Sequence, residues 1–214
     1  LLGNPNTGKS SVFNTLTGLK QTIGNYPGVT VEKKIGSFRV DRTTNVQLID
    51  LPGTYGLNTQ SIDQSIVFDL LLNKNNKDFP DVVVVVADVE NLKRNLLLFS
   101  QIKDLEIPTI LAINMSDQLK SKGIEINVDK LEKELDTKVV LLSARKNKGF
   151  EILKSEIKNY RNLSEKPAFD INEIDPEYFT NLQKTFSGQS VYKLWLLITQ
   201  DINFSKLERN KIDD

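Results

Sequence analysis

Short apolar runs alternate with helical repeats along the first 160 residues of the chain. Two uninterrupted runs, 82–86 and 109–113, are rich in β-branched residues and are typical of strands buried on both faces. In segments 92–105 and 149–160 the apolar residues instead recur every three or four positions, which predicts helices with one buried side. This alternation of strands and helices predicts an α/β fold.

The remaining segments of the first 160 residues extend the same order. Further helices are expected at 11–16, 65–72 and 128–135, and further strands at 31–40, 45–51 and 139–142. Residues 41–44 join two of these strands as a hairpin, and the polar segment 19–30 with Gly24, Pro27 and Gly28 predicts a loop. The expected architecture is a doubly wound, mostly parallel six-stranded sheet with one antiparallel edge strand.

The composition changes after Leu163. Segment 164–167 has the character of a linker, and Asp175 followed by Pro176 marks a helix start. Apolar residues then have helical spacing over 178–186 and, beyond Gly188, over 191–202. We therefore expect one domain at 1–162 and a small α-helical region at 163–214.

Both ends of the sequence suggest a fragment of a longer chain. Only Leu1 and Leu2 precede a loop that normally follows a complete strand, so we expect further residues before them. The helical region is short and ends in the charged segment 211–214, so we expect it to be truncated.

Composition narrows the possible functions. Lys plus Arg and Asp plus Glu number 28 each, and this neutral balance argues against a nucleic-acid scaffold. The chain has neither cysteine nor histidine, which excludes disulfides, thiolate or imidazole metal sites, and imidazole as a general base. No apolar run approaches the roughly 18 residues that a membrane helix needs, so we expect this fragment to be soluble.

The segment GNPNTGKS at 3–10 fits the phosphate-binding pattern G-x-x-x-x-G-K-[ST]. Its glycines let backbone N–H groups approach phosphate oxygens, Lys9 supplies a charge for the β- and γ-phosphates, and the Ser10 hydroxyl can bind Mg²⁺. The expected nucleotide-binding residues here are Gly3, Asn4, Pro5, Asn6, Thr7, Gly8, Lys9, Ser10 and Ser11. The alternative is a glycine-rich turn with an incidental lysine.

A second element, D-x-x-G, follows at the end of the expected strand 45–51. The Asp50 carboxylate is expected to hold Mg²⁺, and the Gly53 N–H can meet the γ-phosphate. The residues assigned to the nucleotide from this element are Asp50, Leu51, Pro52 and Gly53. The alternative is a strand-end aspartate followed by an ordinary Pro-Gly turn.

A third element, Asn114-x-x-Asp117, discriminates between nucleotide bases. A carboxylate can accept hydrogen bonds from guanine N1–H and the 2-amino group, and adenine offers neither donor. Met115 stands where a lysine is usual, and its flexible stem can pack on the base. Ser143 and Ala144 close the expected base site, which predicts GTP and GDP as ligands rather than ATP.

These three elements, with Ser143-Ala144 as a fourth, predict in this order a Ras-like P-loop GTPase, and the chain also resembles a particular family. Together these elements are similar to the cytoplasmic GTPase domain of the ferrous iron transport protein B (FeoB) family over roughly residues 1–160. The segments that carry the resemblance are 3–10, GNYPGVTVE at 24–32, DLPGTY at 50–55, DVENLKRNL at 88–96, and 114–117.

The resemblance implies two switch segments, at 20–31 and about 53–64. It places Gly28, Val29 and Thr30 at the nucleotide, where Thr30 would bind Mg²⁺ and the γ-phosphate, with Thr22 as the competing candidate. We expect Lys9, Asn6, Thr30 and Gly53 to carry catalysis.

Two positions bear on the rate of hydrolysis. Thr54 occupies the place where many small GTPases carry a water-orienting glutamine, and threonine is too short for that role, so slow turnover is expected. In the resembling family the asparagine at Asn6 helps to bind K⁺, which would neutralise transition-state charge. The alternative is that Asn6 only tolerates unusual backbone angles.

The leading hypothesis is a Mg²⁺-dependent GTPase domain whose nucleotide state gates a ferrous iron transporter. The resemblance implies a C-terminal transmembrane iron-permease domain as partner, a place on the cytoplasmic face of the inner membrane, and a helical spacer in the tail that stabilises the GDP-bound state. The tail could instead only cap the domain, and a homo-oligomer is left open. The alternatives are an Era- or TrmE-like GTPase in ribosome assembly or tRNA modification, and a regulator that barely hydrolyses GTP; no nucleic-acid partner is expected.

Overall fold

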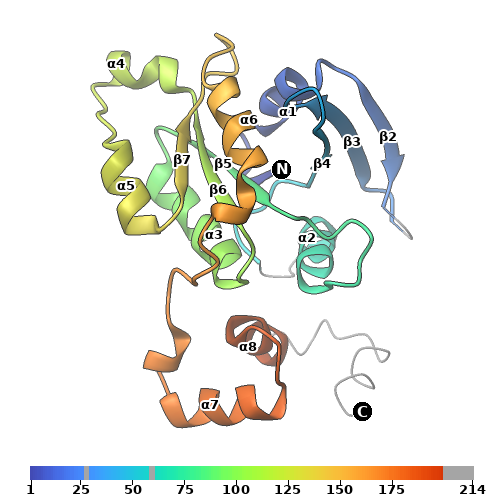
Figure 1. Cartoon of the computed structure of the whole chain (residues 1–214), viewed down its shortest axis with the longest axis vertical. Coiled ribbons are helices and arrows are strands. Elements are labelled where there is room, and N and C mark those ends of the chain that lie inside the picture. Colours follow the sequence, from blue (N-terminus) through green and yellow to red (C-terminus); the bar gives the residue numbers. More distant parts are fainter. Residues whose placement is uncertain (27–28, 58–60, 200–214) are drawn as a thin grey trace.

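A computed structural model of the chain describes residues 1–26, 29–57 and 61–199, and its centre is a parallel sheet (Figure 1). The strands of this sheet are β1 (Leu2–Gly3), β5 (Val83–Asp88), β6 (Thr109–Asn114) and β7 (Lys138–Leu141), hydrogen-bonded in that order. All three pairings are parallel, so the carboxyl ends of the strands lie along one edge.

A second, antiparallel sheet lies beside β1. Its strands are β2 (Gln21–Asn25), β3 (Glu32–Arg39) and β4 (Asn45–Asp50), with β3 in the middle. Two backbone hydrogen bonds join the sheets, because the Leu1 amino group donates to Ile49 O at 2.7 Å and Leu51 N donates to Leu1 O at 3.0 Å. The carboxyl end of β4 therefore lies next to that of β1.

The predicted α/β class is confirmed, with a four-stranded parallel and a three-stranded antiparallel sheet. The prediction of a loop throughout 19–30 is wrong for Gln21–Asn25, which pairs along β3 from Gly36 to Glu32. Every residue of β2 is exposed, so the strand is held by backbone hydrogen bonds and shows no hydrophobic pattern. Gly28 and the end of the second expected tail helix, 200–202, lie outside the described residues.

Eight α-helices lie in the described part of the chain. They are α1 (Lys9–Thr17), α2 (Ile62–Leu72), α3 (Leu92–Asp104), α4 (Leu119–Lys122), α5 (Val128–Leu135), α6 (Phe150–Lys158), α7 (Pro176–Thr185) and α8 (Val191–Thr199). Three short 3₁₀ turns are η1 (Ser116–Gln118), η2 (Tyr160–Asn162) and η3 (Ile171–Glu173).

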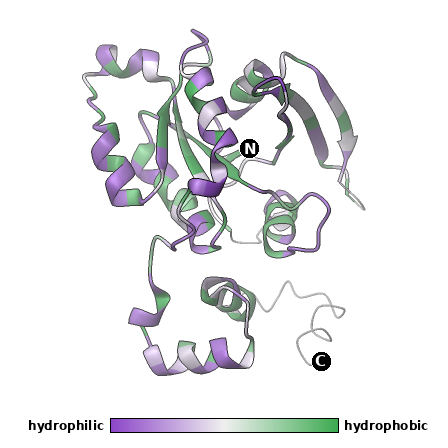
Figure 2. Cartoon of the chain, in the orientation of Figure 1, coloured by the Kyte–Doolittle hydropathy of each residue, from purple (hydrophilic) through white to green (hydrophobic). Residues whose placement is uncertain are grey.

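The core has two apolar layers, one on each face of the parallel sheet. Along β5, Val83 and Val85 pack in one layer, while Val84 and Val86 pack in the other. The first layer includes apolar residues of α2 and α3, and the second includes residues of α1 and α6. Figure 2 shows the largely hydrophobic strands of the parallel sheet between helices that carry both hydrophobic and hydrophilic residues.

The helical tail docks on the end of α3. The buried carboxylate of Asp104 accepts hydrogen bonds from the backbone of Ala168 and Phe169 at 2.7 and 3.0 Å, and Ser190 Oγ donates to Asp104 O at 3.1 Å. Burial raises the pKa of Asp104, and these backbone donors oppose the rise. Helices α7 and α8 lie below the sheet in Figure 1, and the division at 162/163 stays a prediction. Within the described ranges, none of the helices is long and apolar enough to span a bilayer.

Candidate functional site

Two glycines shape a backbone cradle between β1 and α1. Gly3 ends β1 against Val86, and a Cβ there would lie 2.5 Å from Val86 O. Gly8 has φ 79°, and a Cβ there would lie 2.4 Å from Asn114 Nδ2. A side chain at either position would collide with Val86 or Asn114, so both glycines are needed for the path of the loop 3–10 into α1.

The interior of this loop is held by its own short contacts. Thr7 Oγ1 donates to Asn4 O at 2.9 Å, and Asn6 adopts a left-handed backbone with φ 67°. The left-handed angle agrees with the simpler reading of Asn6 as a residue that tolerates the turn. Asn4 is 2 % exposed, and within the described residues neither polar atom of its side chain has a hydrogen-bond partner.

The second predicted element lies directly against the first. Lys9 Nζ donates to Asp50 Oδ1, and both side chains are largely buried. The Cβ position of Gly53 lies 3.4 Å from Pro5 N, and Thr54 N donates to Gly3 O at 3.2 Å. Two segments some forty residues apart are thus brought together, and Ser10 lies in the first turn of α1 beside them.

The Asn114-x-x-Asp117 element forms a connected network at the ends of β6 and β7. Asn114 Nδ2 donates to Thr7 O at 3.0 Å, which ties the base loop to the phosphate loop. Asn114 Oδ1 accepts from Ala144 N at 3.1 Å, and Ser143 Oγ donates to Asp117 Oδ1 at 2.7 Å. The Ser143 hydroxyl lowers the pKa of Asp117, which keeps this carboxylate ionised.

Met115 adopts a left-handed backbone with φ 63° between β6 and η1. A Cβ at Gly8 would lie 3.7 Å from Met115 Cε, so the Met115 side chain reaches back to the phosphate loop. This position agrees with the predicted packing against a base.

Thr30 is not part of this network. Its side chain is exposed, and the nearby backbone is held by Tyr26 N to Val31 O at 3.0 Å and Val29 N to Tyr26 O at 3.3 Å. The competing candidate Thr22 lies on β2 opposite Ile35 and is also exposed. The predicted Mg²⁺ role of Thr30 stays a prediction.

Tyr26 is the residue of this segment that the structure buries. Its ring is 7 % exposed within the main core, and Lys33 Nζ lies 5.7 Å from the ring centre. Burial, followed by the charges of Asp50 and Asp78, raises the pKa of Tyr26. The polar sequence around Tyr26 gave no sign of this burial, and only an isolated aromatic residue in a loop could have suggested it.

The sequence of this site and of the surrounding domain matches a known protein family. The family model described as "Ferrous iron transport protein B" matches residues 1–157. The chain belongs to the FeoB family. The FeoB match covers the loop 3–10, the D-x-x-G element and the network around Asn114 and Asp117 described above.

FeoB relatives agree with this match. An Fe(2+) transporter FeoB from Staphylococcus aureus is 45% identical over 175 residues, which cover 80% of this chain and 25% of that protein. The corresponding protein of Leptospira biflexa is 37% identical over 187 residues, with 86% and 26% covered. The chain thus spans about a quarter of the length of these FeoB relatives.

Solved FeoB structures share the fold. The cytosolic domain of the T. maritima FeoB iron transporter in a GDP form has a TM-score of 0.83 and 33% identity, with 99% of this chain and 90% of that chain covered. A mutant of S. thermophilus NFeoB bound to GDP has a TM-score of 0.77 and 32% identity, with 100% and 85% covered. The G-domain fold of FeoB supports a nucleotide-binding role for this chain.

Proposed function

We propose that this chain binds GTP and GDP and hydrolyses GTP slowly as the regulatory domain of a ferrous iron transporter. The observation that carries the proposal is a network in which Asn114 donates to Thr7 O of the phosphate loop and accepts from Ala144 N. The neighbouring Ser143 Oγ donates to Asp117 in the same network. The network joins a selector for guanine to a cradle for phosphates.

The residues at the phosphate end fit a bound magnesium ion. Ser10 offers a hydroxyl at the start of α1, and Asp50 offers a carboxylate whose present partner is the Lys9 ammonium group. Oxygen ligands of this kind are what Mg²⁺ prefers, and Thr30 would complete the set. When bound, Mg²⁺ neutralises phosphate charge, while Lys9 binds the β- and γ-phosphates and Gly53 N–H orients the γ-phosphate.

Binding and turnover of nucleotides by the unaltered chain test this proposal. GTP and GDP are expected to displace fluorescent GDP from the protein at concentrations at least about 100-fold lower than ATP, because adenine lacks both donors for Asp117. Slow release of phosphate from GTP in the presence of Mg²⁺ is also expected. Equal competition by ATP would contradict the guanine assignment, and absence of phosphate release would reduce the chain to a binding module.

Thr54→Ala is expected to leave hydrolysis within about threefold of the unaltered rate. Thr54 is buried, and its hydroxyl donates to Gly56 O at 2.6 Å, so it serves the local turn rather than an attacking water. Loss of this hydrogen bond should lower the free energy of unfolding by about 1 kcal/mol, as measured in urea. Thr15→Ala, whose exposed hydroxyl donates to Ser11 O, is the matched control and should change neither quantity. Abolished hydrolysis with intact affinity would show that Thr54 acts on the chemistry.

Asn6→Ala is expected to remove a stimulation of hydrolysis by potassium. The unaltered chain should turn over GTP more than about tenfold faster in KCl than in NaCl, if Asn6 helps a cation to neutralise transition-state charge. Alanine would be strained in the left-handed backbone of Asn6, so its effect could come from strain rather than from loss of the amide. Asn6→Gly removes the amide and adopts this backbone without strain. Both variants should hydrolyse at equal rates in the two salts. Equal rates in the unaltered chain would contradict the potassium role.

The gating of Fe²⁺ uptake is the part of the proposal that concerns the whole protein. The support for this part is that the FeoB relatives are named as Fe(2+) transporters. In this proposal the domain lies on the cytoplasmic side of the membrane, and its partner is a membrane permease. A FeoB relative whose first domain is exchanged for this chain should restore iron-dependent growth to a transporter-deficient strain. Family membership favours this role over the soluble Era- or TrmE-like alternative, and tight, salt-sensitive RNA binding would revive that alternative.

A further inference from the structure

Tyr55 follows Thr54 directly, and its ring is covered on one face by an arginine. The Arg94 guanidinium carbon lies 4.1 Å from the centre of the Tyr55 ring, although both side chains are reached by solvent. A planar guanidinium group attracts the π face of an aromatic ring and stacks on it in a way that an ammonium group cannot. The contact joins the segment 53–57 to the first turns of α3.

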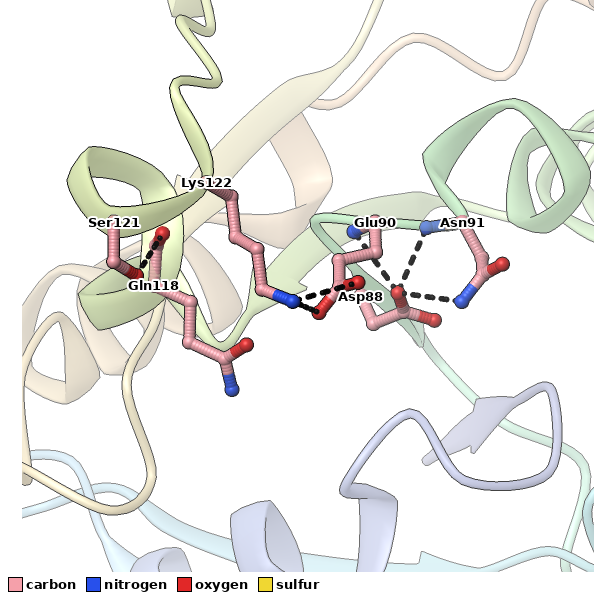
Figure 3. A network of polar contacts seen from close by, with 6 residues as sticks. All are labelled: Asp88, Glu90, Asn91, Gln118, Ser121 and Lys122. Atoms are coloured by element: carbon pink, nitrogen blue, oxygen red, sulfur yellow. Dashed lines mark hydrogen bonds and ion pairs between the residues drawn. The ribbon is translucent and has the colours of Figure 1, made fainter.

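The part of α3 that carries Arg94 is itself fixed to the sheet. Figure 3 shows Asp88 Oδ1 accepting hydrogen bonds from Glu90 N, Asn91 N and Asn91 Nδ2, at 2.8 to 3.0 Å. Asn95 is buried, and its Oδ1 accepts from Asp88 N at 2.8 Å. The end of β5 and the start of α3 thus form one rigid unit, on which Arg94 has a fixed base.

The same unit reaches the guanine side through a weaker contact. The Lys122 ammonium group of α4 lies 3.3 Å from the Glu90 carboxylate, and both are about half exposed. Exposed ion pairs of this kind contribute little free energy. Of the two contacts that this unit makes near the site, we therefore expect the Arg94–Tyr55 stack to have the larger effect on hydrolysis.

A second contact supports the segment 53–57 from the same face of α3. Gln101 lies about two helical turns after Arg94, and its Oε1 accepts from Leu57 N at 3.1 Å. Gly56 permits this approach, because a Cβ there would lie 2.9 Å from Gln101 Oε1. Arg94 and Gln101 thus form a platform under residues 55–57.

We propose that Arg94 is a positioning residue for GTP hydrolysis, which holds Gly53 against the phosphate loop by stacking on Tyr55. Gly53 already lies against Pro5, and only Thr54 separates it from Tyr55. Fixing the ring two residues away restricts the directions that the Gly53 N–H can take, and a preset donor costs no reorganisation during reaction. This inference rests on the proposed GTPase function.

The stack should affect hydrolysis and leave GDP binding alone. GDP lacks the γ-phosphate, so its affinity does not depend on the position of Gly53 N–H. Arg94→Gln and Tyr55→Leu each remove the stack, and each should slow single-turnover hydrolysis of GTP about two- to fivefold. The affinity for fluorescent GDP should stay unchanged in both. Tyr55→Phe keeps the π face and should retain the unaltered rate.

The double variant and a neighbouring cation make the test specific to this pair. Arg94→Gln with Tyr55→Leu should be no slower than either single variant, because both changes remove one interaction. Lys93→Gln removes an exposed charge from the adjacent position of α3 and should leave the rate unchanged. Additive losses in the double variant, an equal loss in Lys93→Gln, or a parallel loss of GDP affinity would each overturn the role of Arg94. Absence of hydrolysis by the unaltered chain, with GDP still bound, would overturn the proposed GTPase function as well.

Discussion

Asp117→Asn should convert the guanine site into one that prefers xanthine. In the proposed complex the carboxylate of Asp117 would accept from two donors of guanine, N1–H and the 2-amino group, whereas an asparagine side chain offers one acceptor and one NH₂ donor. The donor of asparagine then meets a donor of the base, and two charge-assisted hydrogen bonds are lost. Affinity for GTP and GDP is expected to fall at least about 100-fold, since hydrogen bonds to charged groups are worth about 1.5–3 kcal/mol each. Xanthine carries a carbonyl in place of the 2-amino group, so XTP should gain affinity.

The structure favours Asp117→Asn as a clean test. The Ser143 hydroxyl that now donates to Asp117 Oδ1 can donate equally to an amide oxygen, so the loop should keep its shape. Competition of GTP, XTP and ATP against fluorescent GDP measures the exchange of specificity. Asp129→Asn makes the same chemical change at an exposed position of α5 and is the control. Retained GTP affinity without a gain for XTP would show that Asp117 does not contact the base.

The residues of this site could be predicted from the sequence because the polar residues of each motif lie at or just after the end of a strand. Asp50 and Asn114 end β4 and β6, and Lys9 begins α1 after the loop that follows β1. Ligand sites of α/β folds form beyond the carboxyl ends of the strands, which is where these three residues were expected to meet. The Lys9–Asp50 and Asn114–Thr7 contacts confirm that two separate motifs meet the phosphate loop. Spacing and residue type were sufficient for this part.

Contacts that depend on backbone pairing or on distant partners could not be predicted. Strand β2 is exposed throughout and is held by its pairing with β3, so no alternation of hydrophobic residues marks it. The stack of Arg94 on Tyr55 joins residues far apart in the sequence, and neither neighbourhood shows a pattern that pairs them. The sequence marks the segment 88–96 only by its resemblance to the FeoB family, whereas the hydrogen bonds of Asp88 and Asn95 give this segment a structural role.

Lys9→Ala should greatly reduce nucleotide affinity and also lower the free energy of unfolding of the protein without nucleotide. Loss of the charge that meets the β- and γ-phosphates should reduce affinity for GTP and GDP about 100- to 10,000-fold, if two charge-assisted contacts are removed. In the absence of nucleotide the same ammonium group is the partner of Asp50, which is 7 % exposed. Removing one member of a buried ion pair strands the other charge and costs about 3–5 kcal/mol. Fluorescent nucleotide titration and urea unfolding measure the two effects separately.

Two further variants separate the loss of binding from the loss of stability. Lys33→Ala breaks a comparable, largely buried ion pair with Asp78, and neither residue belongs to the phosphate loop or to the D-x-x-G element. It should lower the free energy of unfolding while leaving intrinsic GDP affinity within about threefold. Lys9→Ala combined with Asp50→Asn removes the stranded charge, so stability should largely return while nucleotide binding stays lost. Neutralising Asp50 can restore stability, but it cannot restore a contact between Lys9 and the phosphates. If that double variant bound GDP normally, Lys9 would therefore act only as the partner of Asp50.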